Sequence, residues 1–234
     1  MTTQTLPHKR QVLRYRVGPR IIHAMLASSF VLLLVTGLML VWGPLAPYAA
    51  GGGSRLIHRI GAVVFMLIPV AYLLFDRPGA RELLWDSFHY DRDDWKWLKQ
   101  VYRYFLGHAA EMPPQGRLNA GQKLHHAGVV IFSALIVASG LLLWVGKGSF
   151  TPNGLALAAM LHDVSMLVLT VLLVGHLYFT FVYNALQGMV KGYIPEREAR
   201  LEHSKWVDSL PEKEPWIVEE VVESPESAVL SPEF

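Results

Sequence analysis

The stretch from Leu155 to Asn184 reads LALAAMLHDVSMLVLTVLLVGHLYFTFVYN, and it decides the fold. It is apolar and long enough to cross a bilayer as one helix, which needs about 20 mainly apolar residues. It carries two histidines, His162 and His176. At about 100° and 1.5 Å per residue, their spacing places both on one helix face, about 21 Å apart along the axis. Ionisable groups are costly inside a membrane span, and neutral imidazole is a common metal ligand, so this helix predicts two metal-binding levels.

The composition of the whole chain agrees with a membrane protein. Of its 234 residues, 52% are hydrophobic and 17% are charged, whereas soluble domains carry about 25% charged residues. Cysteine is absent, which excludes disulfides, thiolate-bound iron–sulfur clusters and the Cys-x-x-Cys-His attachment of c-type haem. Basic and aromatic residues do not interleave as nucleic-acid binding requires. A redox centre in this chain must therefore be held by histidine, methionine or similar ligands.

Four segments of span length predict an all-α integral membrane protein built as a four-transmembrane-helix bundle. A membrane domain of residues 1–206 would contain spans at about 21–43, 56–76, 124–145 and 155–184. Between the second and third spans, residues 94–106 have helical apolar spacing within a charged segment, which predicts a cytoplasmic helix lying at the membrane interface. The acidic tail, residues 207–234, is predicted to be disordered. No internal repeat is apparent in the sequence.

Lysine and arginine indicate the orientation in the membrane. They are concentrated in residues 1–20, in 77–123 and at the start of the tail, while each of the two short connections holds one. Both termini are therefore expected on the cytoplasmic side of the membrane. No small-residue cleavage site follows the basic N-terminus, so the first span is expected to be retained rather than removed as a signal peptide.

Two further histidines complete the two levels. His23 opens the first span at the cytoplasmic side, and His58 opens the second span at the outer side. An outer pair, His58 with His162, and an inner pair, His23 with His176, follow from these depths. Each pair comes from two helices, as a haem held between two imidazoles requires. The pattern predicts two b-type haems that transfer electrons, and small residues near the histidines would let a flat macrocycle approach: Gly37, Gly61 and Gly175.

Other interpretations of the histidines stay open from the sequence. A histidine at a span end can be interfacial, in which case the chain would be a non-haem membrane scaffold. A proton-coupled transporter is a further alternative, although Asp163 is almost the only other ionisable group in the spans. His125 and His126 could replace His23 as an inner ligand, lie near the membrane surface, or border a proton or quinone path. The remaining histidines are expected to be solvent-exposed: His8, His89, His108 and His203.

Several short motifs within residues 10–206 carry a resemblance to a known family. They are Arg20-Ile-Ile-His23-Ala, Arg55-Leu-Ile-His58-Arg-Ile-Gly61, Leu118-Asn-Ala-Gly-Gln-Lys123, Leu161-His162, His176-Leu-Tyr178 and Gln187-Gly-Met-Val-Lys-Gly192. The chain resembles the gamma subunit of respiratory formate dehydrogenase, a di-haem cytochrome b. The resemblance implies two haem b groups on the four histidines in the pairing above. It also implies an iron–sulfur beta subunit, a molybdopterin alpha subunit with molybdenum or tungsten, and a possible higher oligomer of that heterotrimer.

The resemblance further implies a quinone site beside the inner haem, at the cytoplasmic side. It matches Asn119, Gly121 and Gln122, and the acceptor would be menaquinone or ubiquinone. Side-chain amides and exposed backbone N–H groups suit the two carbonyl oxygens of a quinone. The alternative is that Asn119 and Gln122 form a helix N-cap, and one residue could do both. Related di-haem subunits serve nickel–iron uptake hydrogenases and thiosulfate or polysulfide reductases, so the partner enzyme stays open.

Overall fold

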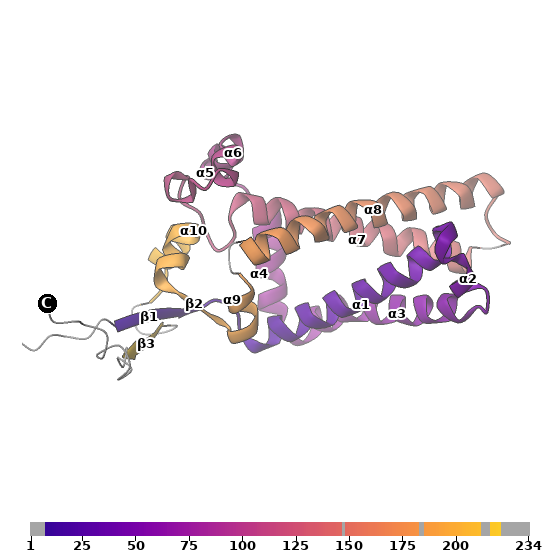
Figure 1. The fold of residues 1–234 in the computed structure, drawn as a ribbon, viewed down its shortest axis with the longest axis horizontal. Helices are drawn as coiled ribbons and strands as arrows, with labels where there is room; N and C mark the ends of the chain where they lie inside the picture. The colour runs from indigo at the N-terminus through magenta and orange to yellow at the C-terminus, as the bar shows by residue number, and fades with distance from the viewer. Residues whose placement is uncertain (1–7, 147, 183–184, 212–215, 221–234) are drawn as a thin grey trace, which may run out of the picture.

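Four long helices form the body of the molecule. The computed structural model describes residues 8–146, 148–182, 185–211 and 216–220. The long helices are α1 (Val17–Val41), α3 (Gly53–Phe75), α7 (Ala120–Val145) and α8 (Pro152–Val182). Helix α1 packs against α3 and α7 packs against α8, so the bundle consists of two helical hairpins (Figure 1).

These helices have the length and surface of membrane spans. Their most apolar 18-residue windows have mean hydropathies of 1.9 to 2.5. Large apolar side chains such as Leu67 and Val171 are 59% and 63% exposed in the isolated chain, as expected of a surface that faces lipid. The prediction of a mainly helical integral membrane protein with four spanning helices is therefore confirmed. Each helix begins three or four residues before the predicted span, because small or polar residues form its first turn.

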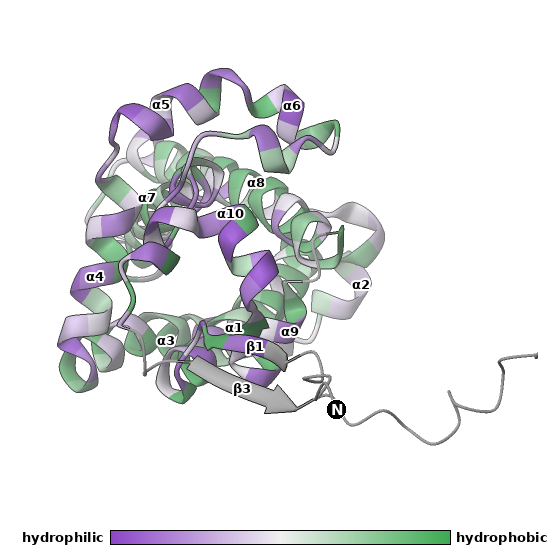
Figure 2. Ribbon diagram, turned by 90° about the vertical axis from the view of Figure 1, so that its left-hand side faces the viewer, coloured by the Kyte–Doolittle hydropathy of each residue, from purple (hydrophilic) through white to green (hydrophobic). Residues whose placement is uncertain are grey.

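The two ends of the bundle differ in construction. At one end, here called the loop end, η1 (Gly43–Leu45) and α2 (Ala46–Ala49) connect α1 to α3. Gly52 precedes α3 with φ of 76°, a conformation that glycine adopts without strain. The opposite end, here called the sheet end, carries most of the polar segments (Figures 1 and 2).

Helical segments between the second and third spans cover part of the sheet end. They are α4 (Arg77–Phe88), α5 (Arg92–Lys99), α6 (Val101–Phe105) and η2 (Ala109–Glu111). The predicted helix at 94–106 is thus two short helices that meet at Gln100. Part of its apolar face is buried, because Trp97 and Tyr104 pack with Ala120 at the start of α7, while Phe105 stays exposed. Its position at a membrane interface stays a prediction.

A three-stranded antiparallel sheet, which the sequence analysis did not predict, lies at the sheet end. Strand β1 (His8–Leu13) is central, between β2 (Tyr193–Pro195) and β3 (Trp216–Glu220). Helix α9 (Leu186–Lys191) precedes β2, and α10 (Glu196–Asp208) follows it. A small core joins β1 to α10, made of Val12, Ala199 and Val207 with Ile194, Trp206 and Leu210 around it.

The C-terminal tail is only partly described. Where the sequence predicts disorder from residue 207, the described residues Trp216–Glu220 form strand β3 instead. The strand is possible because β1 offers a free edge for pairing on the side opposite β2. Residues 221–234 lie outside the described part of the chain, so the prediction for them stands untested.

Candidate functional site

The four predicted histidines form two pairs, each between the two hairpins. His58 on α3 faces His162 on α8, with ring centroids 6.4 Å apart and ring planes at 65°. His23 on α1 faces His176 on α8, with ring centroids 5.9 Å apart and planes at 51°. Helix α8 supplies one ring to each pair. The pairing expected from depth is therefore the pairing in space, at the loop end and the sheet end respectively.

The spacing of each pair fits a metal ion between two ring nitrogens. An imidazole nitrogen lies about 2 Å from a bound metal and about 1.1 Å from its own ring centre, so two ligands on opposite sides have centroids about 6 Å apart. Among the described residues, no group of three or more His, Cys, Asp or Glu side chains could hold a metal. A haem iron needs only two ligands from the protein, because its porphyrin supplies four nitrogens.

Hydrogen bonds orient the loop-end pair for binding through Nε2. His162 Nδ1–H donates to the carbonyl oxygen of Ile136 at 3.0 Å and lies 3.2 Å from Ser139 Oγ. His58 Nδ1 lies 2.9 Å from Thr36 Oγ1, which already donates its own proton to the helix backbone. Thr36 Oγ1 therefore accepts from His58 Nδ1–H. Both tautomers leave Nε2 with a free lone pair for a metal.

The two hairpins repeat this arrangement, so the expectation of no internal repeat is wrong. Val35-Thr-Gly-Leu-Met-Leu-Val-Trp-Gly43 ends the first span, and Ala138-Ser-Gly-Leu-Leu-Leu-Trp-Val-Gly146 ends the third. In each, the hydroxyl residue contacts the histidine on the following helix of its hairpin. The repeat is short, and its hydroxyl residue is Thr36 in one copy and Ser139 in the other. It is recognised only when both hydroxyls are seen to contact a histidine.

Glycines beside the hydroxyl residues let the rings lie against the neighbouring helix. A methyl group at Gly37 would lie 3.4 Å from His58 Cε1. A methyl group at Gly140 would lie 3.0 Å from His162 Cε1 and 3.3 Å from its Nδ1. Gly61 instead faces leucines of α1, and Gly175 meets nothing within 4 Å. Sequence reasoning named Gly37 but missed Gly140, whose match to Gly37 in the repeat could have revealed it.

We expect Gly140→Ala to lower the affinity of the loop-end site for haem by about tenfold to a hundredfold, the usual effect of disturbing the groups that orient a metal ligand. The new methyl displaces the His162 ring and its hydrogen bond to Ile136. The matched control is Gly18→Ala, which adds the same methyl in open space at the start of α1, away from both histidine pairs. Haem content per purified chain measures the effect, and equal content in both variants would contradict it.

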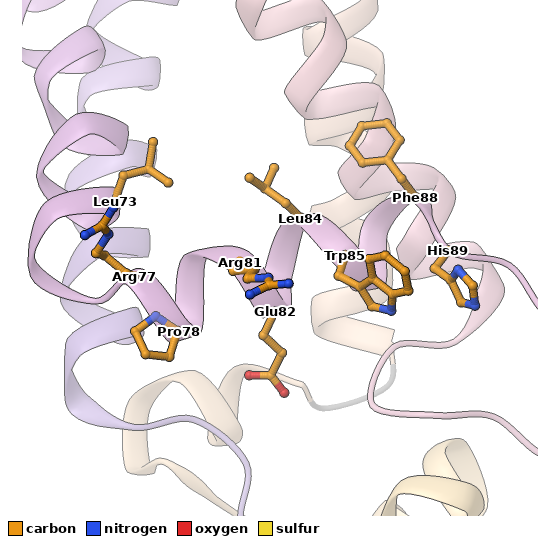
Figure 3. A pocket seen from close by; sticks show the side chains of 9 residues that line it. All are labelled: Leu73, Arg77, Pro78, Arg81, Glu82, Leu84, Trp85, Phe88 and His89. Atoms are coloured by element: carbon orange, nitrogen blue, oxygen red, sulfur yellow. The ribbon is translucent and has the colours of Figure 1, made fainter.

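A cavity of about 450 Å³ lies beside the loop-end pair, a volume within the range of ligand pockets. All four long helices line it, and both histidines of the pair face it. Phe65, Met66 and other apolar side chains form most of its wall. A second cavity, of about 1210 Å³, is an open groove along α4 that contains none of the four paired histidines (Figure 3). The residues around the loop-end cavity thus fit a mostly apolar cofactor held by two imidazoles.

Two more histidines lie beside the sheet-end pair. His125 stacks on His176, with centroids 5.2 Å apart and planes at 16°. A parallel ring offers its face rather than a nitrogen, so this arrangement does not favour His125 as a replacement for His23. His126 lies 5.9 Å from His125, and its buried Nδ1 has no hydrogen-bond partner in the described part of the chain.

The residues predicted to bind quinone lie at the start of α7. Asn119 Oδ1 accepts from Gln122 N at 2.9 Å, and Gln122 Oε1 accepts from Asn119 N at 3.1 Å. The helix-capping alternative is therefore present. Asn119 Nδ2 also donates to Glu202 on α10 at 3.1 Å, and Gly121 lies against the ring of Trp97. The quinone role of these residues stays a prediction.

One histidine expected to be exposed is buried. His203 on α10 is 4% exposed; its Nδ1–H donates to the Gly116 carbonyl at 3.0 Å, and its Nε2 accepts from Arg14 at 3.1 Å. Burial, followed by the Arg14 guanidinium, holds the pKa of His203 well below its ordinary value. The chain is kinked at His203, so the spacing of Ala199, His203 and Val207 alone does not reveal this burial. His89 and His108 are exposed as predicted, and the His8 side chain lies outside the described part.

A four-helix membrane bundle with paired imidazoles at two levels defines the class of membrane-bound b-type cytochromes. The chain belongs to the prokaryotic cytochrome b561 family, whose model matches residues 14–192. Membership implies haem b as the cofactor.

Several curated relatives are named as cytochrome b556 subunits of formate dehydrogenases. The cytochrome b556 subunit of formate dehydrogenase from Haemophilus influenzae is 25% identical over 213 residues, which are 88% of this chain and 86% of the relative. The cytochrome b556(fdo) subunit of formate dehydrogenase from Escherichia coli K12 is 26% identical over 203 residues, 83% of this chain and 91% of the relative. The nitrate-inducible cytochrome b556(Fdn) subunit of the same organism is 23% identical over 119 residues, 50% of this chain and 55% of the relative.

Proposed function

We propose that this chain is the membrane-anchoring, di-haem cytochrome b subunit of a respiratory formate dehydrogenase. It would pass electrons from an iron–sulfur beta subunit to a quinone at the cytoplasmic side. The single observation that carries the proposal is that the histidines form two pairs, with ring centroids 6.4 Å and 5.9 Å apart. Helix α8 supplies one histidine to each pair. The names of relatives that align with more than four-fifths of the chain support formate dehydrogenase as the complex.

The residues around the two sites have two roles: some would bind the haems, and others exclude water. A haem bound between two histidines supplies reversible one-electron transfer without an open site for substrate at the metal. His58 and His162 would bind the outer haem, and His23 and His176 the inner one. Thr36 and Ser139 fix the ring orientation of the outer pair. The apolar wall of the cavity excludes water, which strengthens the electrostatic interactions inside it.

The sheet end is proposed to face the cytoplasm of a prokaryotic inner membrane. The basic residues of the N-terminal and 77–123 segments support this orientation through the positive-inside rule. The inner pair and the start of α7 would then share the cytoplasmic side. Gly121 N–H has no hydrogen-bond acceptor in the described part of the chain, and first-turn N–H groups lie at the positive end of the helix dipole. This N–H would donate to a carbonyl of menaquinone or ubiquinone, next to Asn119 and Gln122.

The proposed partners complete the electron path. An iron–sulfur beta subunit would deliver electrons, and a molybdopterin alpha subunit with molybdenum or tungsten would oxidise formate. The heterotrimer would assemble further into a higher oligomer. The alternative partners, a nickel–iron uptake hydrogenase or a thiosulfate or polysulfide reductase, would use the same membrane subunit with another donor or acceptor.

Spectroscopy of the purified complex tests the proposal. We expect two haem b per chain, and a reduced-minus-oxidised spectrum in which formate reduces both b-type components and an added quinone reoxidises them. Reduction by hydrogen but not by formate would favour the hydrogenase alternative. A purified chain without b-type absorbance would favour the non-haem scaffold and refute the proposal.

A further inference from the structure

The loop-end cavity has one charged wall. Arg55 and Arg59, one helical turn apart on α3, line it together with the carboxylate of Asp163 on α8. Arg55 lies one turn nearer the loop end than His58, and Arg59 follows His58 directly. The apolar wall at Phe65 and Met66 lies farther along α3, toward the sheet end. The charged groups of the cavity thus lie toward the loop end, beside apolar side chains such as Val41 and Trp144, and its wall toward the middle of the bundle is apolar.

The two arginines lack an anionic partner within the described part of the chain. Asp163 shares the cavity, but no ion pair joins it to either arginine. Instead, the Arg59 guanidinium lies 5.5 Å from the ring centroid of Trp144 on α7. Two like charges four residues apart on a helix repel each other, and a bound anion between them would relieve that repulsion. This arrangement favours a bound group with two negative charges.

Haem b has that distribution of charge, because its two propionate carboxylates lie on one edge of an otherwise apolar macrocycle. Guanidinium groups bind carboxylates through paired, charge-assisted hydrogen bonds. We infer that Arg55 and Arg59 bind the propionates of the outer haem and turn its polar edge toward the loop end. Trp144 holds Arg59 in place through a cation–π contact. This inference rests on the proposed di-haem function and assigns the two arginines as positioning residues.

The arginines also tune the reduction potential of the outer haem. The oxidised haem carries one more positive charge than the reduced haem, so nearby cations favour the reduced form. Removing one guanidinium should weaken the preference for the reduced form by roughly tenfold, which is about 59 mV for one electron. The inner pair lies about 21 Å away along α8, so its haem should keep its potential.

Potentiometric titration of the complete complex at fixed pH tests the inference. The variants are Arg55→Gln, Arg59→Gln and Arg59→Lys. The control is Arg77→Gln in the α4 groove, which removes one positive charge, as the other two glutamine variants do (Figure 3). We expect the outer component to shift to lower potential in both glutamine variants. Arg59→Lys should shift it less, and Arg77→Gln should leave it unchanged. The outer component is identified by its absence from a His162→Leu variant.

Two results would overturn the inference. One is an unchanged outer potential in the Arg55→Gln/Arg59→Gln double variant at full haem content. The other is equal loss of the outer haem from Arg59→Lys and Arg59→Gln, because packing against Trp144 rather than charge would then be required. Loss of the outer haem from Arg59→Gln alone, with Arg59→Lys retaining it, would support the inference. A wild-type complex with fewer than two haem components would instead refute the proposed function.

Discussion

Replacing His162 with leucine is expected to remove one of the two haems and to abolish formate-driven quinone reduction. The leucine fills a similar volume but offers no nitrogen, so the outer level keeps only His58. Disturbing the groups that orient a metal ligand already lowers metal affinity or activity by roughly tenfold to a hundredfold. Losing the ligand itself should lower both by more. We expect a fall in quinone reduction on the order of a hundredfold or more, with half of the haem content retained.

Comparison of the four histidine variants separates the two levels. His58→Leu should give the same residual spectrum as His162→Leu, since the two rings form one pair. His23→Leu and His176→Leu should share the other spectrum. His108→Leu is the matched control, because that histidine is exposed at the sheet end. Full haem content in His162→Leu would contradict the assignment and favour the transporter interpretation.

The pairing of the histidines could be predicted because it depends only on helix geometry and span order. A fixed rise per residue sets the depth of His162 and His176 on one helix, and antiparallel spans set the depths of His23 and His58. The groups that orient the rings could not be predicted in the same way. Thr36 and Ser139 contact histidines on neighbouring helices, so their role depends on how each hairpin packs.

The sheet end was harder to predict because its contacts are distant in sequence. Strand β1 pairs with β2 and β3, which lie about 180 to 210 residues later. Short strands give a weak local signal, and their pairing depends on chain segments brought together by the bundle. His203 was misjudged for the same reason: α10 is polar, and only its packing on β1 buries the face that carries Ala199, His203 and Val207.

Acid is expected to loosen α10 from the rest of the sheet end through His203. Its folded-state pKa lies well below the 6.5 of the free side chain, through burial and then the Arg14 guanidinium. Unfolding therefore takes up a proton once the pH falls below about 6.5, and the free energy of unfolding drops by up to about 1.4 kcal/mol per pH unit. The stability is fully present above that pH and is lost as the pH falls toward the folded-state pKa.

Neighbouring carboxylates define the pH range in which this effect can be isolated. Burial raises the pKa of Glu202, opposed by hydrogen bonds from Tyr104 and Asn119. Its contribution therefore has the opposite sign, falling as the pH rises from about 4.5. Burial also raises the pKa of Asp91, but the Lys205 ammonium and backbone N–H groups outweigh it and bring the value to about 2. Between pH 7.5 and 5.5, Asp91 stays ionised in both states, so among His203, Glu202 and Asp91 only His203 has a stabilising contribution that is lost as the pH falls.

Hydrogen exchange in β1 and α10 measures the effect in the intact complex. We expect protection of both elements, corrected for intrinsic exchange, to fall by about tenfold between pH 7.5 and 5.5, which is about 1.4 kcal/mol of local opening free energy. His203→Gln is the informative variant, because its amide can donate to the Gly116 carbonyl and accept from Arg14 without titrating. Its protection should stay level across the range. An equal fall in the variant would place the sensitivity in a group other than His203, and a level wild-type profile would mean that protonated His203 is tolerated beside Arg14.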